Sequence, residues 1–342
     1  MFIVELIMTI LGLTLIGGYL CLLLRWVYCL RREWRKRYFA QGTRRLHQGK
    51  FEAAIAKFTK AIQKQPENVD AYLGRSHAYI RMNELDKALA DCDTVIRLQP
   101  TNHFAFLNRG AIYGLKEDYP RSLADTTQCL ELQPEYQDAL FNRACTFSRL
   151  GNTEEALVDF SKAILLSPSK IDNYIERGNL FFDTQQYSKA IEDFTQAMKL
   201  GDSTAELLTC RGYAYLKMEL FEKAIADYEL AIEIDPHARP ALNNLAWLLA
   251  TCPVPEYRDG NRALALALRN CEQVDETEWS DSGVLAAAYA EVGQFDDAVR
   301  LINEALMKAP EHENITCEAQ LKCYENLQPY RDSTLKSSSD EQ

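Results

Sequence analysis

Proline recurs with a period of 34 residues along most of this chain. One register contains Pro66, Pro100, Pro134, Pro168 and Pro236, and Asp202 occupies the remaining slot within the same flanking pattern. A fixed period of this length is typical of one helix-turn-helix motif copied along the chain, in which each copy buries its apolar face only by stacking on its neighbours. The spacing therefore predicts an all-α array of repeats, which offers a binding surface rather than a catalytic pocket.

Other positions of the repeat also keep their residue type. With each proline at position 32, repeats begin at residues 35, 69, 103, 137, 171 and 205, and the fifth repeat carries Tyr174, Gly178, Phe181, Ala190, Phe194 and Ala197 at positions 4, 8, 11, 20, 24 and 27. This pattern resembles the tetratricopeptide repeat family. The resemblance implies a right-handed α-α superhelix with a concave groove that binds peptides or partner proteins.

Two more repeats complete an array of eight within residues 31–312. The predicted boundaries are 35–68, 69–102, 103–136, 137–170, 171–204, 205–238, 239–278 and 279–312. Repeat seven is longer between its helices because Pro253 and Pro255 end the first helix and Gly260 permits the turn into the second. We interpret the insertion as a tolerated loop or a partner-contacting loop, and it resembles one found in bacterial repeat proteins. Residues 313–328 are expected to form a capping helix, and residues 329–342 a disordered tail.

The first 30 residues predict a single transmembrane anchor. Residues 6–24 contain no charged residue, and a helix of that length, at about 1.5 Å per residue, spans a hydrocarbon core of about 30 Å. A cleaved signal peptide is the alternative, but no Lys or Arg precedes the apolar run and no A-x-A-like site follows it. The flank after the run carries Arg25, Arg31, Arg32, Arg35, Lys36 and Arg37. Because positive residues stay on the cytoplasmic side, the array is expected to face the cytoplasm.

Charge and composition favour protein partners over nucleic acid or catalysis. The net charge is −11 despite the basic flank, so the array itself is acidic and would repel phosphate backbones. The ten cysteines form no CxxC pair and are expected to be reduced. The five histidines fall in different repeats without metal-ligand spacing, and neither a Gly-rich phosphate loop nor a G-x-S-x-G motif occurs. We therefore expect no cofactor, no metal and no enzymatic activity.

A charged pair recurs inside the repeats. Position 7 is Arg75, Arg109, Arg143, Arg177 and Arg211 in five successive repeats, and position 23 of the same repeats is Asp91, Asp125, Asp159, Asp193 and Asp227. Repeats one, seven and eight lack both members. Because position 7 lies on the packed side of the first helix and position 23 on the second, we predict a hydrogen-bonded Arg–Asp pair within each repeat. The alternative is an arginine ladder for acidic ligands, which the matched aspartates would neutralise.

The family resemblance also places a ligand groove along positions 2, 5, 9 and 12. The candidate residues are Phe39, Thr43, Leu73, His77, Leu107, Phe141, Ile175, Asn179, Phe182, Thr209, Tyr213, Leu216, Asn243 and Trp247, with Ala111 and Cys145 at position 9 of repeats three and four. This apolar and aromatic surface would suit an extended or helical peptide with apolar anchors. Phe39 and Thr43 stand where a chaperone-tail clamp needs Lys and Asn, so that ligand is not expected. The aromatic rings could instead pack between repeats.

These features lead to two hypotheses of different classes. The first is a membrane-anchored scaffold or adaptor that binds partner proteins in the groove. The second is a structural or assembly factor that self-associates, or holds an envelope complex together, without a dedicated peptide ligand. An enzyme subunit whose active site is completed by a partner is a third possibility.

Overall fold

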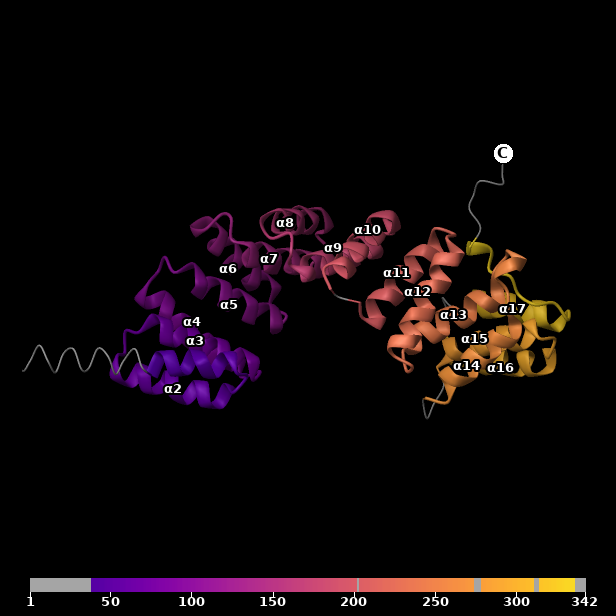
Figure 1. Cartoon of the computed structure of the whole chain (residues 1–342), viewed down its shortest axis with the longest axis horizontal. Helices are drawn as coiled ribbons and strands as arrows, with labels where there is room; N and C mark the ends of the chain where they lie inside the picture. The colour runs from indigo at the N-terminus through magenta and orange to yellow at the C-terminus, as the bar shows by residue number, and fades with distance from the viewer. Residues whose placement is uncertain (1–37, 202, 274–277, 311–313, 336–342) are drawn as a thin grey trace, which may run out of the picture. The chain divides into compact units, whose positions relative to one another are not determined.

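The computed structural model describes residues 38–201, 203–273, 278–310 and 314–335 (Figure 1). All regular structure among these residues is helical, as the proline period predicts. The chain divides into two compact parts, an N-terminal lobe (Met1–Leu166) and a C-terminal lobe (Ser167–Gln342). The anchor predicted for residues 1–30 lies outside the described residues, and no helix within the described ranges is long and apolar enough to cross a membrane.

The N-terminal lobe is built from antiparallel helix pairs, one pair for each predicted repeat. The pairs are residues 38–47 with α2 (Phe51–Lys64), α3 (Val69–Arg81) with α4 (Leu85–Leu98), α5 (His103–Leu115) with α6 (Tyr119–Leu132), and α7 (Gln137–Arg149) with α8 (Thr153–Leu166). Each helix from α2 to α7 packs against the next one along the chain, and the first helices α3, α5 and α7 also contact one another in order.

The C-terminal lobe continues the same plan. Its pairs are α9 (Ile171–Asp183) with α10 (Tyr187–Lys199), α11 (Ala205–Lys217) with α12 (Phe221–Ile234), α13 (Arg239–Thr251) with α14 (Gly260–Cys271), and α15 (Trp279–Glu291) with α16 (Phe295–Lys308). A short 3-10 turn, η1 (Pro255–Tyr257), lies in the insertion of repeat seven. Helix α17 (Asn314–Glu325) packs on α16 and α15, and η2 (Ser333–Leu335) follows it.

A left-handed residue ends the first helix of most repeats. It stands at position 15 each time, as Gly49, Asn83, Glu117, Gly151, Gln185, Glu219 and Gly293. In repeat three the amide of Glu117 donates to the Gly114 carbonyl at 3.0 Å, and the amide of Asp118 donates to Tyr113 at 2.9 Å. These bonds satisfy carbonyls that the helix itself leaves open. Repeat seven has Pro253 at position 15, and proline cannot take a positive φ, so its first helix must end differently.

In repeats one, five and six, a small residue on the first helix faces a large ring on the second, which sets the spacing of the two helices. A Cβ built on Gly178 would lie 2.7 Å from Cε1 of Phe194, and one on Gly212 would lie 2.8 Å from Cε1 of Tyr228. Phe194 and Tyr228 are completely buried, as are Ala190 and Ala224 at position 20. The residue types at positions 8, 20 and 24 of the family pattern therefore allow the two helices to pack closely.

The structure brings each position-7 arginine against the position-23 aspartate of its own repeat. In all five repeats Nε and Nη2 of the arginine donate to the two carboxylate oxygens at 2.6 to 3.0 Å. The aspartate side chains are only 3 to 9 % exposed. Such bidentate pairs are stronger than single hydrogen bonds between neutral groups. The bond to Asp91 raises the pKa of Arg75 above its ordinary value.

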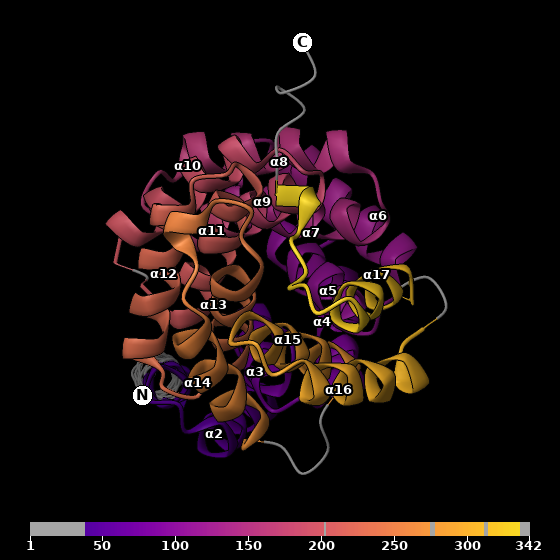
Figure 2. The same ribbon diagram turned by 90° about the vertical axis from the view of Figure 1, so that its right-hand side faces the viewer.

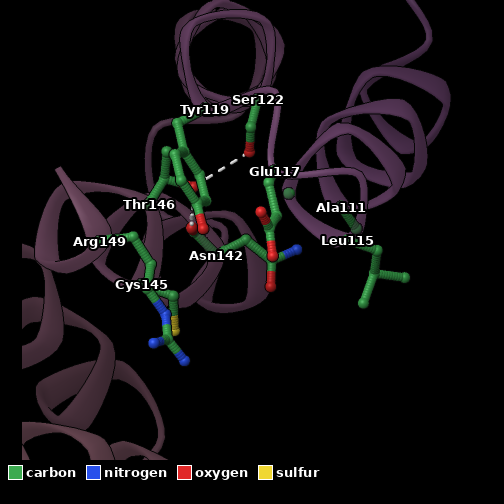
Figure 3. Close-up of a pocket in the computed structure, with 10 residues that line it drawn as sticks. Ala111, Leu115, Glu117, Tyr119, Ser122, Asn142, Cys145, Thr146 and Arg149 are labelled. Atoms are coloured by element: carbon green, nitrogen blue, oxygen red, sulfur yellow. Dashed lines mark hydrogen bonds between the residues drawn. The ribbon is translucent and has the colours of Figure 1, made fainter.

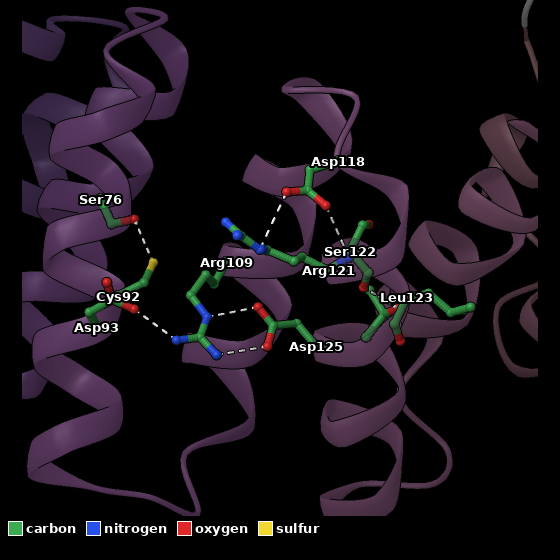
Figure 4. Close-up of polar contacts among 10 residues, drawn as sticks. Ser76, Cys92, Asp93, Arg109, Asp118, Arg121, Ser122, Leu123 and Asp125 are labelled. Carbon is green, nitrogen blue, oxygen red and sulfur yellow. Dashed lines mark hydrogen bonds and ion pairs between the residues drawn. The ribbon is translucent and has the colours of Figure 1, made fainter. Parts of the chain in front are cut away.

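The third arm of the guanidinium reaches the preceding repeat. Nη1 of Arg109 donates to Asp93 at 2.7 Å (Figure 4). The same atom of Arg75 donates to Thr59 at 3.0 Å, and that of Arg211 donates to Thr195 at 3.1 Å. These acceptors all stand at position 25, so each of these three arginines joins two helices of its own repeat and one helix of the repeat before it.

The prediction of a disordered tail over residues 329–342 is wrong for its first part. Residues 329–335 are ordered, and Asp332 and Leu335 are 8 % and 2 % exposed. The amide of Asp332 donates to the Thr251 carbonyl at 3.0 Å. The polar composition of this segment therefore serves specific contacts with α13 rather than solvation. Residues 336–342 lie outside the described residues.

Removing one aspartate tests the value of the pairs. Asp159→Ala should lower the free energy of unfolding by about 3 kcal/mol, because it leaves the partly buried Arg143 guanidinium without its acceptor. Glu131→Ala on α6, where the side chain is exposed, is the control and should change that free energy by less than about 0.5 kcal/mol. Urea denaturation followed by circular dichroism measures both. Equal stability of the two variants would show that the pairs do not stabilise the array.

A second substitution tests the close approach of the helices. Gly178→Ala should destabilise the array by about 1 to 3 kcal/mol, because the new methyl group would overlap the Phe194 ring. Gly114→Ala is the matched control: its Cβ would meet only Ser122 Oγ at 3.5 Å, so the higher helix propensity of alanine should make it neutral or slightly stabilising. Thermal unfolding compares the two, and the double variant Gly178→Ala/Phe194→Leu should recover part of the loss.

Candidate functional site

The predicted groove residues all lie on the first helix of their repeat. The N-terminal lobe carries Phe39 and Thr43 in residues 38–47, Leu73 and His77 on α3, Leu107 on α5, and Phe141 on α7; the C-terminal lobe carries Ile175, Asn179 and Phe182 on α9, Thr209, Tyr213 and Leu216 on α11, and Asn243 and Trp247 on α13. First helices pack side by side where α5 contacts α3 and α7, and where α13 contacts α11 and α15. Neighbouring candidates on these helices therefore share one layer within each lobe.

Burial divides the candidates into surface and core. Leu216 is 3 % exposed and Thr209 is 9 % exposed, so both belong to the packed interior, a correction to their assignment as groove residues. Both side chains are buried because neighbouring helices pack against them. The Thr209 hydroxyl donates a hydrogen bond to the Ala205 carbonyl at 2.7 Å. His77 is exposed and the other candidates are half-buried. Partial desolvation, with the charge of Arg81, lowers the pKa of His77.

The N-terminal lobe contains a pocket of about 530 Å³ formed by α5, α6 and α7 (Figure 3). It is lined by Ala111, Gly114, Leu115, Glu117, Tyr119, Ser122, Asn142, Cys145, Thr146 and Arg149. Ala111 and Cys145 are the position-9 residues of repeats three and four, so the pocket lies on the predicted groove. The buried hydroxyls of Ser122 and Thr146 form a hydrogen bond with each other at 3.0 Å, so both are paired within the wall of the pocket.

Small residues create this pocket, and polar residues give it its chemistry. Ala111 and Gly114 remove side-chain volume from the wall formed by α5. Asn142 supplies an amide that can both donate and accept, and exposed Arg149 supplies a cation. This combination can bind the backbone of a peptide and a carboxylate group. Asn142, Thr146 and Arg149 were missed because they stand at positions 6, 10 and 13, outside the family's groove positions.

A second, basic pocket of about 380 Å³ lies in repeat one. It is lined by Gln41, Arg44, Arg45, Gln48 and Lys57. Gln41 and Lys57 occupy positions 7 and 23, where the next five repeats have their Arg–Asp pair. Repeat one therefore has an amide and an ammonium group at these two positions. It lacks the aspartate that neutralises the arginine in the next five repeats.

Aromatic residues gather on α9 and α11 in the C-terminal lobe. The rings of Phe182 and Tyr213 lie 5.4 Å apart between centroids, and Phe182 also contacts Tyr187 at 5.8 Å. The ammonium group of Lys217 sits 5.2 Å from the centre of the Tyr213 ring. Phe182 and Tyr213 thus pack between adjacent repeats, as the alternative for the aromatic positions predicts, and both remain partly exposed.

The groove position Trp247 is covered by the chain itself. Its indole Nε1 donates to Asp332 Oδ2 at 3.0 Å, and its ring lies 6.0 Å from the ring of Tyr330. Sequence reasoning missed this contact because it treated residues 329–342 as a tail. The available signal was an aromatic residue and a leucine, Tyr330 and Leu335, within an otherwise polar stretch.

The cysteines offer little reactivity. Burial raises the pKa of Cys92 to about 12 and that of Cys129 to about 11, so both thiols stay protonated near neutral pH. No group of His, Cys, Asp and Glu side chains in the described part of the chain could hold a metal ion.

Sequence comparison identifies the repeats directly. Family models of the tetratricopeptide repeat match residues 45–105, 126–158, 171–200 and 205–238. These matches fall in both lobes. Those at 171–200 and 205–238 coincide with α9–α10 and α11–α12, and those at 45–105 and 126–158 span parts of adjoining repeats. A search of curated proteins found no match.

Solved structures share this architecture. PilF of Pseudomonas aeruginosa is 18 % identical and matches 63 % of this chain and 98 % of its own, with a TM-score of 0.57. YrrB, described as a TPR protein with an unusual peptide-binding site, is 24 % identical over 55 % of this chain and 96 % of its own, with a TM-score of 0.47. A Parabacteroides merdae repeat protein covers 85 % of this chain and 99 % of its own at 16 % identity and a TM-score of 0.48.

The likeness to PilF supports the repeat fold, and the family matches identify its sequence pattern. Proteins built from these repeats serve as protein–protein interaction scaffolds. The chain belongs to the tetratricopeptide repeat family.

Proposed function

We propose that this protein is a membrane-anchored scaffold that binds partner proteins or peptides on the first-helix surfaces of its repeats. The observation that carries the proposal is the pocket of about 530 Å³ between α5, α6 and α7, on the face where the sequence places the groove. A pocket with small apolar walls and a few polar groups is typical of a site that binds one side chain and fixes the peptide beside it.

The chemistry of the pocket favours a peptide segment. Ala111 and Gly114 leave room for an apolar anchor, Asn142 can pair with a peptide bond, and Arg149 can bind a carboxylate. The aromatic cluster of Phe182 and Tyr213 offers a second apolar surface of the kind on which interface energy is concentrated. The net charge of −11 supports protein partners rather than nucleic acid.

The sequence supports a location at the membrane. The uncharged run 6–24 is long enough to span, and the basic flank that follows it favours a cytoplasmic array. Anchoring would hold the partners close to the bilayer, where a second contact with the same complex gains from a high effective concentration. The protein would thus act by recruitment rather than by catalysis.

A reporter fused after Gln342 tests the orientation. In a bacterial host, green fluorescent protein at this point should fluoresce, and alkaline phosphatase should be inactive, because the flank keeps the array in the cytoplasm. Replacing Arg25, Arg31, Arg32, Arg35, Lys36 and Arg37 by glutamine is the control and should produce mixed orientations. An active phosphatase fusion of the unchanged protein would contradict the proposed location.

Affinity capture tests the binding surface. The full-length protein and the variants Asn142→Ala/Arg149→Ala and Phe182→Ala/Tyr213→Ala would be captured from gently solubilised membranes. Partners that use these surfaces should fall by about tenfold or more in one of the two variants. Arg97→Ala, an exposed substitution on the second helix α4, should retain them.

Two other outcomes would contradict partner binding on the first-helix surfaces. The same partners at equal yield from every variant would move the contact to another face. No partner with any form of the protein would favour the assembly factor that self-associates.

A further inference from the structure

The chain folds its own C-terminal segment onto the groove of repeat seven. The segment Tyr330–Leu335, called the C-terminal strap below, follows α17 and returns to α13 (Figure 2). Leu335 is 2 % exposed, whereas Leu327 in the connection from α17 is 69 % exposed. Asn326 and Gln328 are exposed as well. The strap is thus buried against the lobe, whereas the connection that joins it to α17 is exposed.

The strap is bound as an extended peptide is bound, through its backbone and three successive side chains. The Asp332 amide donates to the Thr251 carbonyl at 3.0 Å, and the Asp332 carboxylate accepts from Trp247. Nη1 of Arg331 donates to the Ala250 carbonyl at 3.1 Å and to Glu291 at 2.6 Å. Tyr330 lies against Trp247. Backbone pairing combined with pockets for particular side chains is the usual basis of peptide recognition.

The insertion of repeat seven explains why this seat exists. Pro253 replaces the left-handed residue at position 15, and Pro255 stands four residues after Thr251, where it has no N–H to donate to that carbonyl. The Leu249 carbonyl is reached by the Asp259 amide at 3.0 Å. The carbonyls of Ala250 and Thr251 are reached by the strap. Because α13 ends before Pro253, the carbonyls of Ala250 and Thr251 have no amide of the same helix to accept from and are left for an added segment.

A charged socket beside these carbonyls selects the chemistry of the occupant. Glu291, whose side chain is 13 % exposed, forms an ion pair with Arg258 of the insertion at 3.3 Å and accepts a hydrogen bond from Arg331 of the strap at 2.6 Å. Arg258 also donates to the Cys252 carbonyl at 3.0 Å. Positive groups are favoured at a helix C-terminus, and α13 and α15 both end here. A segment that binds at this seat therefore needs a basic side chain, followed by a residue whose backbone N–H donates and whose carboxylate accepts.

We propose that this seat is a peptide-binding site, and that the strap is its tethered occupant, which a partner displaces with an extended segment carrying an aromatic, a basic and an acidic residue in succession. The inference rests on the proposed function and names the peptide chemistry of one part of that surface. Since a short tether gives an effective concentration on the order of millimolar, the free site should bind such a segment much more tightly than the strapped site does.

The experiment uses a fluorescein-labelled peptide with the sequence of residues 328–342 and the purified chain with residues 329–342 deleted. Fluorescence anisotropy should show saturable binding to the deleted chain, and at least about tenfold weaker binding to the full-length chain. A peptide with Asp332→Ala should bind at least about tenfold more weakly, because it loses the bond from Trp247 and the two bonds that Thr334 donates to the other carboxylate oxygen. A peptide with Ser333→Ala, at an exposed side chain, is the matched control and should bind unchanged.

A variant that keeps the whole chain guards against loss of folding. The full-length Arg331→Ala/Asp332→Ala protein should retain its helical circular dichroism and gain binding of the unchanged peptide, whereas adding Trp247→Ala should abolish that gain. Equal peptide binding by the full-length and deleted chains would overturn the proposal. Absence of binding to both, or loss of the helical fold in both strap variants, would overturn it by making the strap an integral part of the lobe. Because the assay contains no cellular partner, peptide binding without captured partners would count against the proposed function alone.

Discussion

The close approach of the two helices of each repeat, with a small residue at position 8 of the first helix, is the constraint on which the polar contacts of the array depend. Where Gly178 faces Phe194, the helices approach so closely that one methyl group would not fit. That spacing brings position 7 of the first helix within reach of position 23 of the second. The five Arg–Asp pairs, with both carboxylate oxygens engaged at 2.6 to 3.0 Å, span this distance. Two of them form in repeats whose position 24 is Cys92 or Thr126, so the feature that all five share is a small residue at position 8 and not a ring at position 24.

The repeats that lack the Arg–Asp pair have other polar residues and contacts in its place. In repeat one, Gln41 and Lys57 replace the pair, and they line the basic pocket. In the last repeats a different carboxylate, Asp281, is buried at 4 % exposure and accepts from Arg239 at 2.5 Å and from Asn270 at 2.8 Å. The buried charge is again paired, as the cost of desolvating it requires. Here, however, the carboxylate lies on α15 of repeat eight, and its partners lie on α13 and α14 of repeat seven.

The sequence allowed the repeated features to be predicted because each depends on residues at fixed spacing. Helix boundaries, the glycine–ring contact and the arginine partners all follow from positions 7, 8, 20, 23 and 24. The pocket beside Asn142 and Arg149 could not be predicted in this way, since it arises from small residues on one repeat and polar residues on the next. The strap could not be predicted either, because its seat lies some 80 residues earlier in the chain, as the Trp247–Asp332 bond shows. The depth of Leu216 likewise depends on neighbouring helices.

The end of the first helix is where this array can acquire binding sites. In repeat three the left-handed Glu117 turns the backbone so that local amides satisfy the carbonyls, and only side chains such as Arg149 on the next helix remain for a ligand. In repeat seven Pro253 cannot make that turn, so the carbonyls of Ala250 and Thr251 themselves become available. In the proposed function, the first arrangement would select ligands by side-chain chemistry. The second adds backbone pairing, which requires an extended segment, and the strap supplies one.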